Sequence, residues 1–341
     1  MQDDQNLGGS GFAIGTIPVG GRAVLAPLSG VTDVAFRRIA CRFGAALVVS
    51  EMVACDDYVR GAEEARLRAE GQGIAPHVVQ LAGCEPKRLA EAARLAEASG
   101  AAIVDINMGC PAKRVTGGEA GSALMRRLDL ASQLIAAVVA AVAIPVTVKM
   151  RLGWDEASLN AAELARRAEA LGARAVTVHG RTRQQFFKGR ADWARIAEVS
   201  RAVALPVIAN GDIESRTDAA ACLRLSGADA VMIGRAAMGR PWLVGQVAAA
   251  LAGDPVEEPS GAAKSEAAVE HYEGLLSLLG REVGVRHARK HLAAYAGEAL
   301  ARGGGVGEAD RAALVTTDAP PVAIAILRRL YEPGERVQAA A

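Results

Sequence analysis

The sequence predicts a closed (β/α)8 barrel, or TIM barrel, followed by a small all-helical C-terminal domain. Eight short runs of β-branched and apolar residues recur before residue 252, and segments with helical periodicity separate them. The runs lack the apolar–polar alternation of half-exposed strands, so we expect parallel strands that are buried on both faces. Eight such strands joined by helical crossovers are typical of the closed barrel. A doubly wound open sheet is the alternative fold.

The predicted strands are short and consist mainly of valine, isoleucine, leucine and alanine. They cover residues 23–26, 47–50, 77–81, 102–107, 145–150, 175–179, 206–210 and 230–233. Between them we expect helices such as 85–99 and 157–171. Several helical segments end in a Gly-Ala step, at Gly100, Gly172 and Gly227, which is typical of a helix stop directly before a strand.

A turn-rich segment at residues 253–260 ends the alternating region. The chain beyond it has helical periodicity and no predicted strand. We therefore expect two domains, a barrel over residues 1–252 and a helical domain over residues 261–335. In the second domain, the glycine-rich residues 303–308 predict a loop between helices, and Pro320 is expected to open the last helix.

The balance of charge excludes a strong overall electrostatic field. Thirty-nine lysines and arginines face 38 acidic residues, which leaves a formal net charge of +1. A nucleic acid or membrane partner would therefore need a local basic patch. Five cysteines form no CxxC pair, and the five histidines lack metal-ligand spacing, so we expect a reducing, cytoplasmic environment and no metal.

Neither export nor membrane insertion is expected. The first residues contain two aspartates and no basic stretch before an apolar one, which argues against a secretory signal. The longest uncharged run, residues 130–148, has the length of a membrane span. It contains Pro145 and several polar residues, so we expect it to split at Ile144–Pro145 into a helix and a buried strand.

Polar side chains follow every predicted strand, at the end where a barrel builds its active site. An isolated residue of this kind is more often a helix cap, but here all eight strand ends carry one. They are Pro27 and Ser29, Glu51, Gln80, Asp105 with Asn107 and Cys110, Lys149 with Arg151, His179, Asn210 to Asp212, and Gly234 with Arg235.

The last two strand ends predict a phosphate site. Asn210, Gly211 and Asp212 follow the seventh strand, and Gly234 and Arg235 follow the eighth. Barrels commonly bind a phosphate there through backbone N–H groups, and Arg235 adds positive charge. The glycine spacing of a Rossmann dinucleotide site is absent from the sequence.

Two further groups of residues suggest chemistry in the barrel. Lys149, Gln80 and His179 lie at similar depth and suit a flat heteroaromatic ring, although a hydrogen-bonded core network is the alternative. Cys110 lies in a turn between Gly109 and Pro111. A lone cysteine is usually inert, but one at this end of a barrel can act as a nucleophile or an acid.

One block of the sequence consists of residues 105–111, DINMGCP, followed by Lys113, Gly117 and 121–124. This block resembles the signature of the tRNA-dihydrouridine synthases. The resemblance is closest to the bacterial B-type branch and runs from about residue 12 to 331. The cysteine block is the most specific part, because flavin and phosphate barrels share the others. Those other blocks are residues 25–33, 148–153, 179–183 and 210–213, and the resemblance also includes residues 286–291.

This resemblance implies FMN in the barrel mouth and NADPH as its reductant. It places Pro27, Leu28, Ser29, Gln80, Lys149 and His179 around the flavin ring and ribityl chain, and Asn210, Gly211, Asp212, Gly234 and Arg235 at the phosphate. The implied reaction reduces the C5–C6 double bond of a uridine in the tRNA D-loop. Reduced flavin gives a hydride to C6, Cys110 gives a proton to C5, and Asn107 holds the pyrimidine edge.

A basic helix is expected to contact the tRNA substrate. Arg286, Arg289 and Lys290 fall at i, i+3 and i+4, which places them on one helical face. Arg181 and Arg183, after the sixth strand, are further expected contacts with the tRNA.

We expect the protein to be a monomer. The alternatives are an FMN barrel that reduces a small free pyrimidine, and a non-catalytic RNA-binding or flavin-storage protein.

Overall fold

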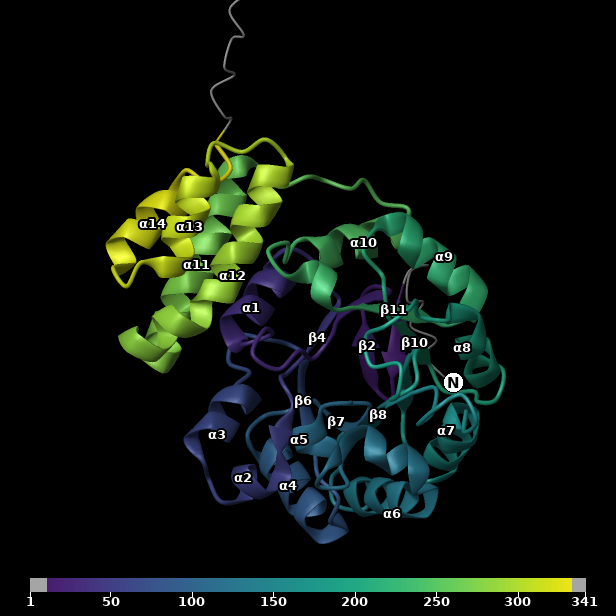
Figure 1. Ribbon diagram of the computed structural model, residues 1–341. Helices are drawn as coiled ribbons and strands as arrows, with labels where there is room; N and C mark the ends of the chain where they lie inside the picture. Colours follow the sequence, from purple (N-terminus) through teal and green to yellow (C-terminus); the bar gives the residue numbers. More distant parts are fainter. Residues whose placement is uncertain (1–10, 333–341) are drawn as a thin grey trace, which may run out of the picture.

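The computed structural model describes residues 11–332 and contains a closed parallel barrel with a helical tail (Figure 1). Neighbouring strands pair in parallel in the order β4-β3-β11-β10-β9-β8-β7-β6, and a β4–β6 pairing closes the ring. The predicted TIM barrel is confirmed, and the open sheet is excluded because no edge remains in the eight-stranded ring. Residues 1–10, on which the expectation of no secretory signal depends, lie outside the described residues.

The eight strands form where the sequence places them, to within one or two residues. Their bounds are β3 Ala23–Leu25, β4 Leu47–Val49, β6 His77–Ala82, β7 Ile103–Met108, β8 Val146–Arg151, β9 Ala175–His179, β10 Val207–Asn210 and β11 Ala230–Ile233. Their side chains are almost all buried, as the absence of alternation predicts. A two-residue strand, β5 (Val53–Ala54), extends the pairing of β6.

A hairpin that the sequence analysis missed packs against one end of the barrel interior. Strands β1 (Phe12–Ile14) and β2 (Ile17–Val19) pair antiparallel. Phe12, Ile14 and Val19 share one buried cluster with inward-facing residues of the barrel strands. Strands of three residues carry too little periodicity to be recognised in the sequence.

Helices surround the barrel and cover its outer face. They are α1 Val34–Arg42, α2 Cys55–Val59, α3 Glu63–Ala69, α4 Pro86–Ala98, α5 Lys113–Thr116, α6 Leu128–Val139, α7 Ala161–Ala170, α8 Trp193–Ser200, α9 Arg216–Ser226 and α10 Leu243–Ala252, with short 3-10 turns η1 Gly121–Arg126 and η2 Arg235–Ala237. The uncharged run at 130–148 divides into α6 and β8 as predicted. Among the described residues, the structure has no helix with the length and apolar character of a bilayer span.

One predicted helix starts later than its periodicity suggests. Helix α7 begins at Ala161 rather than near residue 157. The preceding residues form a loop in which Gly153 pairs with Leu159 across an isolated bridge. A Cβ atom on Gly153 would lie 2.0 Å from the carbonyl oxygen of Ser158, so this close approach requires glycine.

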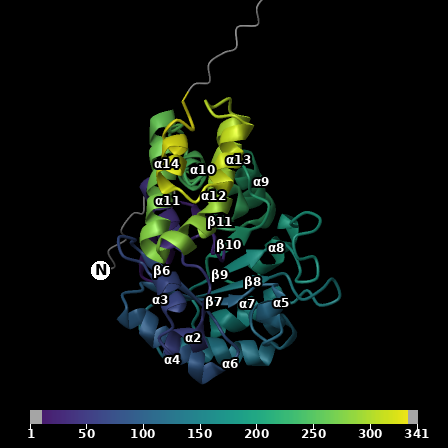
Figure 2. The ribbon, with the colours of Figure 1, turned by 60° about the vertical axis from the view of Figure 1, so that its left-hand side comes forward.

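The tail consists of helices α11 (Gly261–Leu279), α12 (Arg281–Ala301), α13 (Glu308–Thr316) and α14 (Pro320–Arg328). These helices pack around a cluster of their own, with Tyr272, Leu292 and Tyr295 at its centre. The predicted loop at 303–308 lies between α12 and α13, and Pro320 opens α14. Figure 2 shows the tail beside the barrel, with α11 and α12 toward it.

Trp242 joins the barrel to the tail. It precedes α10 in the chain, yet it is buried in the tail cluster and meets Phe43 and Tyr331 edge-on, each at 5.9 Å between ring centroids. The hydrophobic core of the tail therefore includes a side chain from the region predicted as barrel.

A buried polar cluster also joins the two parts. Asp33 caps α1 of the barrel, and its Oδ2 lies 3.0 Å from Nε2 of His271 and 3.9 Å from Nε2 of His291, both in the tail. Burial opposes ionisation of Asp33, but His271 and His291 hold its pKa well below the usual range. Nδ1 of His271 lies 3.1 Å from the hydroxyl oxygen of Tyr295. This cluster orients the tail on α1.

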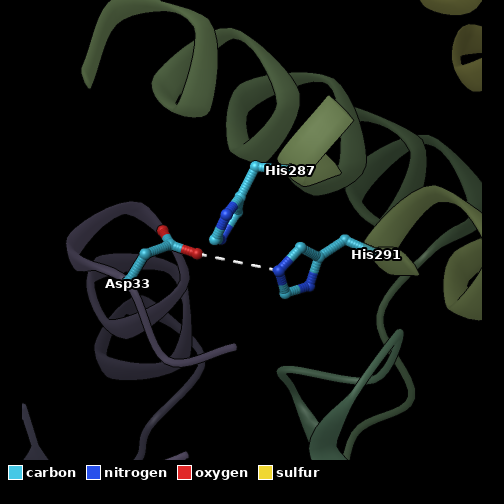
Figure 3. A group of neighbouring side chains, drawn as sticks. All are labelled: Asp33, His287 and His291. Carbon is cyan, nitrogen blue, oxygen red and sulfur yellow. Dashed lines mark ion pairs between the residues drawn. The ribbon is translucent and has the colours of Figure 1, made fainter. Parts of the chain in front are cut away.

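Asp33, His287 and His291 could together offer ligands to a metal ion, and Figure 3 shows them converging from α1 and α12. Their ligand atoms lie within 4.8 Å of one another. A tetrahedral zinc ion holds its ligand atoms roughly 3.3 Å apart. Since Oδ2 of Asp33 is already within hydrogen-bond distance of His271, we interpret the group as a contact between barrel and tail.

Replacing Gly245 with alanine should destabilise the protein. A Cβ atom there would lie 1.7 Å from the carbonyl oxygen of Phe43, so α1 and α10 would have to separate. We expect a loss of about 1–3 kcal/mol in the free energy of unfolding, measured by urea denaturation. The control is Gly297→Ala in α12, where nothing lies within 4 Å, and it should stabilise by about 0.5–1 kcal/mol. Equal effects of the two substitutions would contradict this packing.

Candidate active site

The carboxyl ends of the barrel strands surround a cavity of about 260 Å³. Side chains from all parts of the barrel line it, because parallel strands end on the same side of a closed barrel. Thirteen of the predicted site residues are among the lining residues: Pro27, Leu28, Ser29, Gln80, Asn107, Cys110, Lys149, His179, Asn210, Gly211, Asp212, Gly234 and Arg235. The structure therefore brings these residues together.

A hydrogen-bonded chain runs from the barrel interior to the Cys110 loop. Thr147 and Gln80 each donate to the buried carboxyl group of Asp105, at 2.6 and 2.7 Å. Burial raises the pKa of Asp105. Nδ2 of Asn107 then donates to Oε1 of Gln80 at 2.7 Å. The core network that the sequence left open as an alternative for Gln80 is thus present, and Gln80 also lines the cavity.

Asn107 positions the cysteine. Its Oδ1 accepts hydrogen bonds from the backbone N–H groups of Gly109 and Cys110, at 3.1 and 2.9 Å. Both functional ends of the Asn107 amide are therefore engaged within the protein, and one N–H of Nδ2 remains for a ligand. That N–H is the donor with which Asn107 could hold the pyrimidine edge, which stays a prediction.

Further contacts fix the Cys110 loop at the cavity. The carbonyl oxygen of Cys110 accepts from the backbone N–H and the hydroxyl of Ser122, at 3.0 and 2.9 Å. Nε of Arg151 donates to the carbonyl oxygen of Gly109 at 2.9 Å. Cys110 itself is partly exposed and lines the cavity. Its thiol is close enough to Lys149 and Arg151 to influence the pKa of both.

Lys149, His179 and Asn210 form a second polar group in the cavity. Nδ2 of Asn210 donates to the carbonyl oxygen of Met232, so its Oδ1 faces the other two side chains. That oxygen accepts from Nζ of Lys149 at 3.2 Å and from Nδ1 of His179 at 2.8 Å. The Asn210 side chain therefore supports Lys149 and His179, and a contact between its backbone and a phosphate stays a prediction.

Burial and neighbouring cations change the ionisation of this group. Burial, with Arg151 nearby, lowers the pKa of Lys149 to about 8. Burial and the neighbouring cations lower the pKa of His179 well below its usual range, so its imidazole is neutral at neutral pH. Since Nδ1 of His179 carries the proton, Nε2 is left as an acceptor.

Gly211, Asp212 and Arg235 occupy the region predicted for the phosphate. Gly211 has a φ of 118°, and a Cβ atom on it would lie 2.7 Å from Cβ of Ala191, so this turn requires glycine. The Asp212 carboxylate pairs with the guanidinium of Arg181 and lies 3.5 Å from that of Arg235. Burial disfavours the charged form of Asp212, but the hydrogen bond from Arg181 helps to lower the pKa of Asp212 below its ordinary value. Arg235 keeps its guanidinium largely exposed at the cavity.

Arg181 is not placed to contact a substrate, which corrects its predicted role. It is 1% exposed. Besides pairing with Asp212, it donates to the carbonyl oxygens of Lys188 and Gly189, at 3.1 and 2.8 Å. A buried arginine paired in this way holds the loop after β9 in shape.

The other predicted substrate contacts lie outside the cavity lining. Arg183 stacks near the ring of Trp154, with Cζ 4.8 Å from the centroid. In α12, Arg286 is exposed, whereas Arg289 is paired with Asp318 at 2.9 Å. Lys290 is half-buried, and its Nζ would lie 3.8 Å from a Cβ atom on Gly30, so its ammonium group faces the turn after β3. The basic face of α12 thus borders the barrel.

Several cavity residues were not assigned from the sequence. Arg151 follows Lys149 at a strand end, but its position in the sequence indicates no role, because its three backbone acceptors lie in loops that meet only in the fold. Phe186 and Phe187 also line the cavity and are 41% and 45% exposed. Two consecutive aromatic residues in a chain with 4% aromatics are the sequence signal that could have identified them.

Comparison with known proteins identifies the family. A sequence model described as dihydrouridine synthase (Dus) matches residues 24–304. The chain belongs to the dihydrouridine synthase family. It is 51% identical over 316 residues to a probable tRNA-dihydrouridine synthase of Rhodobacter capsulatus, which covers 92% of this chain and 95% of that protein. It is 48% identical over 285 residues to tRNA-dihydrouridine synthase B of Xanthomonas axonopodis pv. citri, covering 83% and 86%.

Solved structures share the fold of this dihydrouridine synthase family member at low sequence identity. An old yellow enzyme homologue from Zymomonas mobilis aligns with a TM-score of 0.50 at 16% identity, covering 68% of this chain and 89% of that one. Histamine dehydrogenase from Rhizobium sp. aligns with a TM-score of 0.53 at 13% identity, covering 77% and 50%. These similarities concern the barrel fold alone.

Replacing Lys149 with methionine should change how stability depends on pH in protein freed of small ligands. The folded pKa of about 8 lies below the ordinary value of 10.5, so the charged form of Lys149 costs the folded state about 3 kcal/mol below pH 8. That cost disappears as the pH rises from 8 toward 10.5, because the folded state loses the proton first. We expect Lys149→Met to be more stable than the parent at pH 7 and to keep less than half of this advantage at pH 9.5, by urea unfolding. A difference that is constant with pH would contradict the lowered pKa.

Proposed function

We propose that this family member is an FMN-dependent tRNA-dihydrouridine synthase that uses NADPH to reduce the C5–C6 double bond of a uridine in the tRNA D-loop. The observation that carries the proposal is the position of Cys110. It lines a cavity whose other polar groups include Lys149, His179 and Gln80. Relatives of about 50% identity over most of the chain have the name tRNA-dihydrouridine synthase, which supports the proposal.

The residues that line the cavity suit a ligand with an electron-rich ring at one end and a phosphate group at the other. Lys149 can carry a positive charge, and the neutral His179 and the turn at Pro27 to Ser29 border the same space. Arg235 and the glycine turns at 211 and 234 supply charge and accessible backbone on another side. These residues would hold FMN. When bound and reduced by NADPH, FMN supplies the hydride that C6 of the uracil ring receives.

Cys110 completes the reduction by donating the thiol proton to C5 of the uracil ring. The hydride and the proton together balance the loss of the double bond, and the cysteine is left as a thiolate. The guanidinium of Arg151 and the ammonium of Lys149 lie close enough to stabilise that negative charge. Hydrogen bonds from Ser122 and to Asn107 hold the loop, so the thiol keeps its position during transfer.

A base in folded RNA must leave its stack to enter a cavity of this size. Phe186 and Phe187 lie exposed at the cavity, and exposed aromatic rings commonly stack on unpaired bases. The basic residues of α12 lie beside the turn after β3 and can contact phosphates of the same RNA. Both features favour a nucleic acid over a small free pyrimidine as the substrate.

Replacing Cys110 with alanine should remove most uridine reduction and leave the flavin bound. A general acid contributes about 10² to 10⁴ in rate. We expect the variant to release FMN on denaturation and to form dihydrouridine at least about 100-fold more slowly than the parent, measured by mass spectrometry of digested tRNA. Dihydrouridine formation within about threefold of the parent would exclude the thiol as the acid. Loss of FMN together with activity would indicate a structural cysteine instead.

Replacing Arg286, Arg289 and Lys290 together with alanine should weaken tRNA binding. Arg289 is partly neutralised by Asp318, so Arg286 and Lys290 should account for most of the effect. The slope of log K against log salt should fall by about 0.7 to 0.9 for each phosphate that the variant no longer binds. Arg328→Ala, exposed on α14 of the same tail, serves as the control. If the triple variant kept the affinity and slope of this control, the tail would not bind the RNA.

A further inference from the structure

A second group of cations lies across the barrel mouth from the tail. Arg126 ends η1, Trp154 lies in the loop after β8, and Arg183 lies in the loop after β9. In the closed ring, β8 and β9 lie opposite β3 and β4, which are next to the tail. These three residues therefore lie on the side of the barrel mouth opposite α12, outside the set of residues that line the cavity.

Backbone contacts fix the loops that present Trp154 and Arg183. The N–H of Arg183 donates to the carbonyl oxygen of Gly153 at 3.0 Å, and the N–H of Gln184 donates to that of Trp154 at 2.9 Å. The pairing of β8 with β9 is thus followed by hydrogen bonds between the loops that continue the two strands. The positions of both side chains are set by the barrel itself.

Another contact brings Arg126 to the same place. Nδ2 of Asn160, at the end of the Trp154 loop, donates to the carbonyl oxygen of Met125 at 2.7 Å. Cζ of Arg126 lies 3.9 Å from the centroid of the Trp154 ring, and Cζ of Arg183 lies 4.8 Å from it. Cation–π contacts at these distances restrict both guanidinium groups and leave their N–H edges available.

Neither guanidinium group is neutralised within residues 11–332. Arg126 and Arg183 form no ion pair there, whereas neighbouring Arg127 pairs with Glu119, and Arg181 pairs with Asp212. Nε of Arg183 is buried without a hydrogen-bond partner among these residues. Each of these two arginines is held on the same indole ring and forms no ion pair among the described residues, and a single guanidinium group can bind a phosphate through two N–H groups.

We propose that Arg126, Trp154 and Arg183 form a phosphate-binding site that holds the RNA backbone next to the base in the cavity. The proposal rests on the proposed tRNA substrate. Its position supports it: η1 also carries Ser122, which holds the Cys110 loop, and the Arg183 loop also carries Phe186 and Phe187 at the cavity. A phosphate bound here belongs to a nucleotide close to the target uridine, and together with α12 the site holds the RNA on both sides of the mouth.

The test measures binding of an unmodified tRNA transcript between 50 and 200 mM salt. The variants are Arg126→Ala/Arg183→Ala and Trp154→Leu, and the control is Arg166→Ala, which removes an exposed charge from the outer helix α7. We expect the double variant to bind about tenfold more weakly, with a slope of log K against log salt lower by about 0.7 to 0.9 if one phosphate is released. Trp154→Leu keeps both charges, so it should bind more weakly with a smaller change in slope. Thermal unfolding close to that of the parent would show that each variant is folded.

Two results would overturn the site. One is a double variant that binds the transcript with the affinity and slope of Arg166→Ala. The other is a double variant whose tRNA affinity is unchanged but whose Michaelis constant for NADPH rises about tenfold relative to its Michaelis constant for NADH. That result would mean that these arginines bind the 2′-phosphate of the dinucleotide. The binding measurement requires no turnover, so it tests this phosphate site even if the parent protein forms no dihydrouridine. A parent protein that forms no dihydrouridine would contradict the proposed function and not the phosphate site.

Discussion

The guanidinium of Arg151 connects two of the loops that shape the cavity. It is 2% exposed and donates to the carbonyl oxygens of Gly109, Thr182 and Phe186. One buried cation thus ties the Cys110 loop to the loop after β9. A buried charge without such hydrogen bonds would be very costly, so these loops are held in the one arrangement that supplies all three acceptors.

The same charge contributes to the electrostatics of the cavity. Burial lowers the pKa of Lys149 and of His179, and the charge of Arg151 lowers both further. Asp212 offsets little of this positive charge, because its carboxylate is already paired with Arg181. A cavity with this excess of positive charge favours electron-rich and anionic ligands.

The tail is attached to the barrel by contacts of two kinds. Trp242 extends from the barrel into the tail core, and the buried Asp33 of α1 meets His271 and His291. The apolar contact of Trp242 holds the tail close to the barrel, and the directional hydrogen bond between Asp33 and His271 fixes the orientation of the tail on the barrel. This attachment also places the ammonium group of Lys290 beside the turn after β3.

The sequence by itself determined the barrel, the order of its strands and the residues at their carboxyl ends. This was possible because runs buried on both faces have a clear pattern, and because the ends of parallel strands meet in any closed barrel. It also singled out Cys110, whose glycine- and proline-bounded turn carries the family resemblance. The β1–β2 hairpin was too short to show any such pattern.

Only the tertiary structure decided which polar side chains are free to act. Arg181 and Arg183 are two residues apart, yet Arg181 is paired with the carboxylate of Asp212, whereas Arg183 is stacked on Trp154. Asn107 lies in β7 and Asn210 ends β10, but each side chain is occupied in supporting a neighbour. Availability depends on partners contributed by other strands and loops, and local sequence does not specify which of these come within hydrogen-bonding distance.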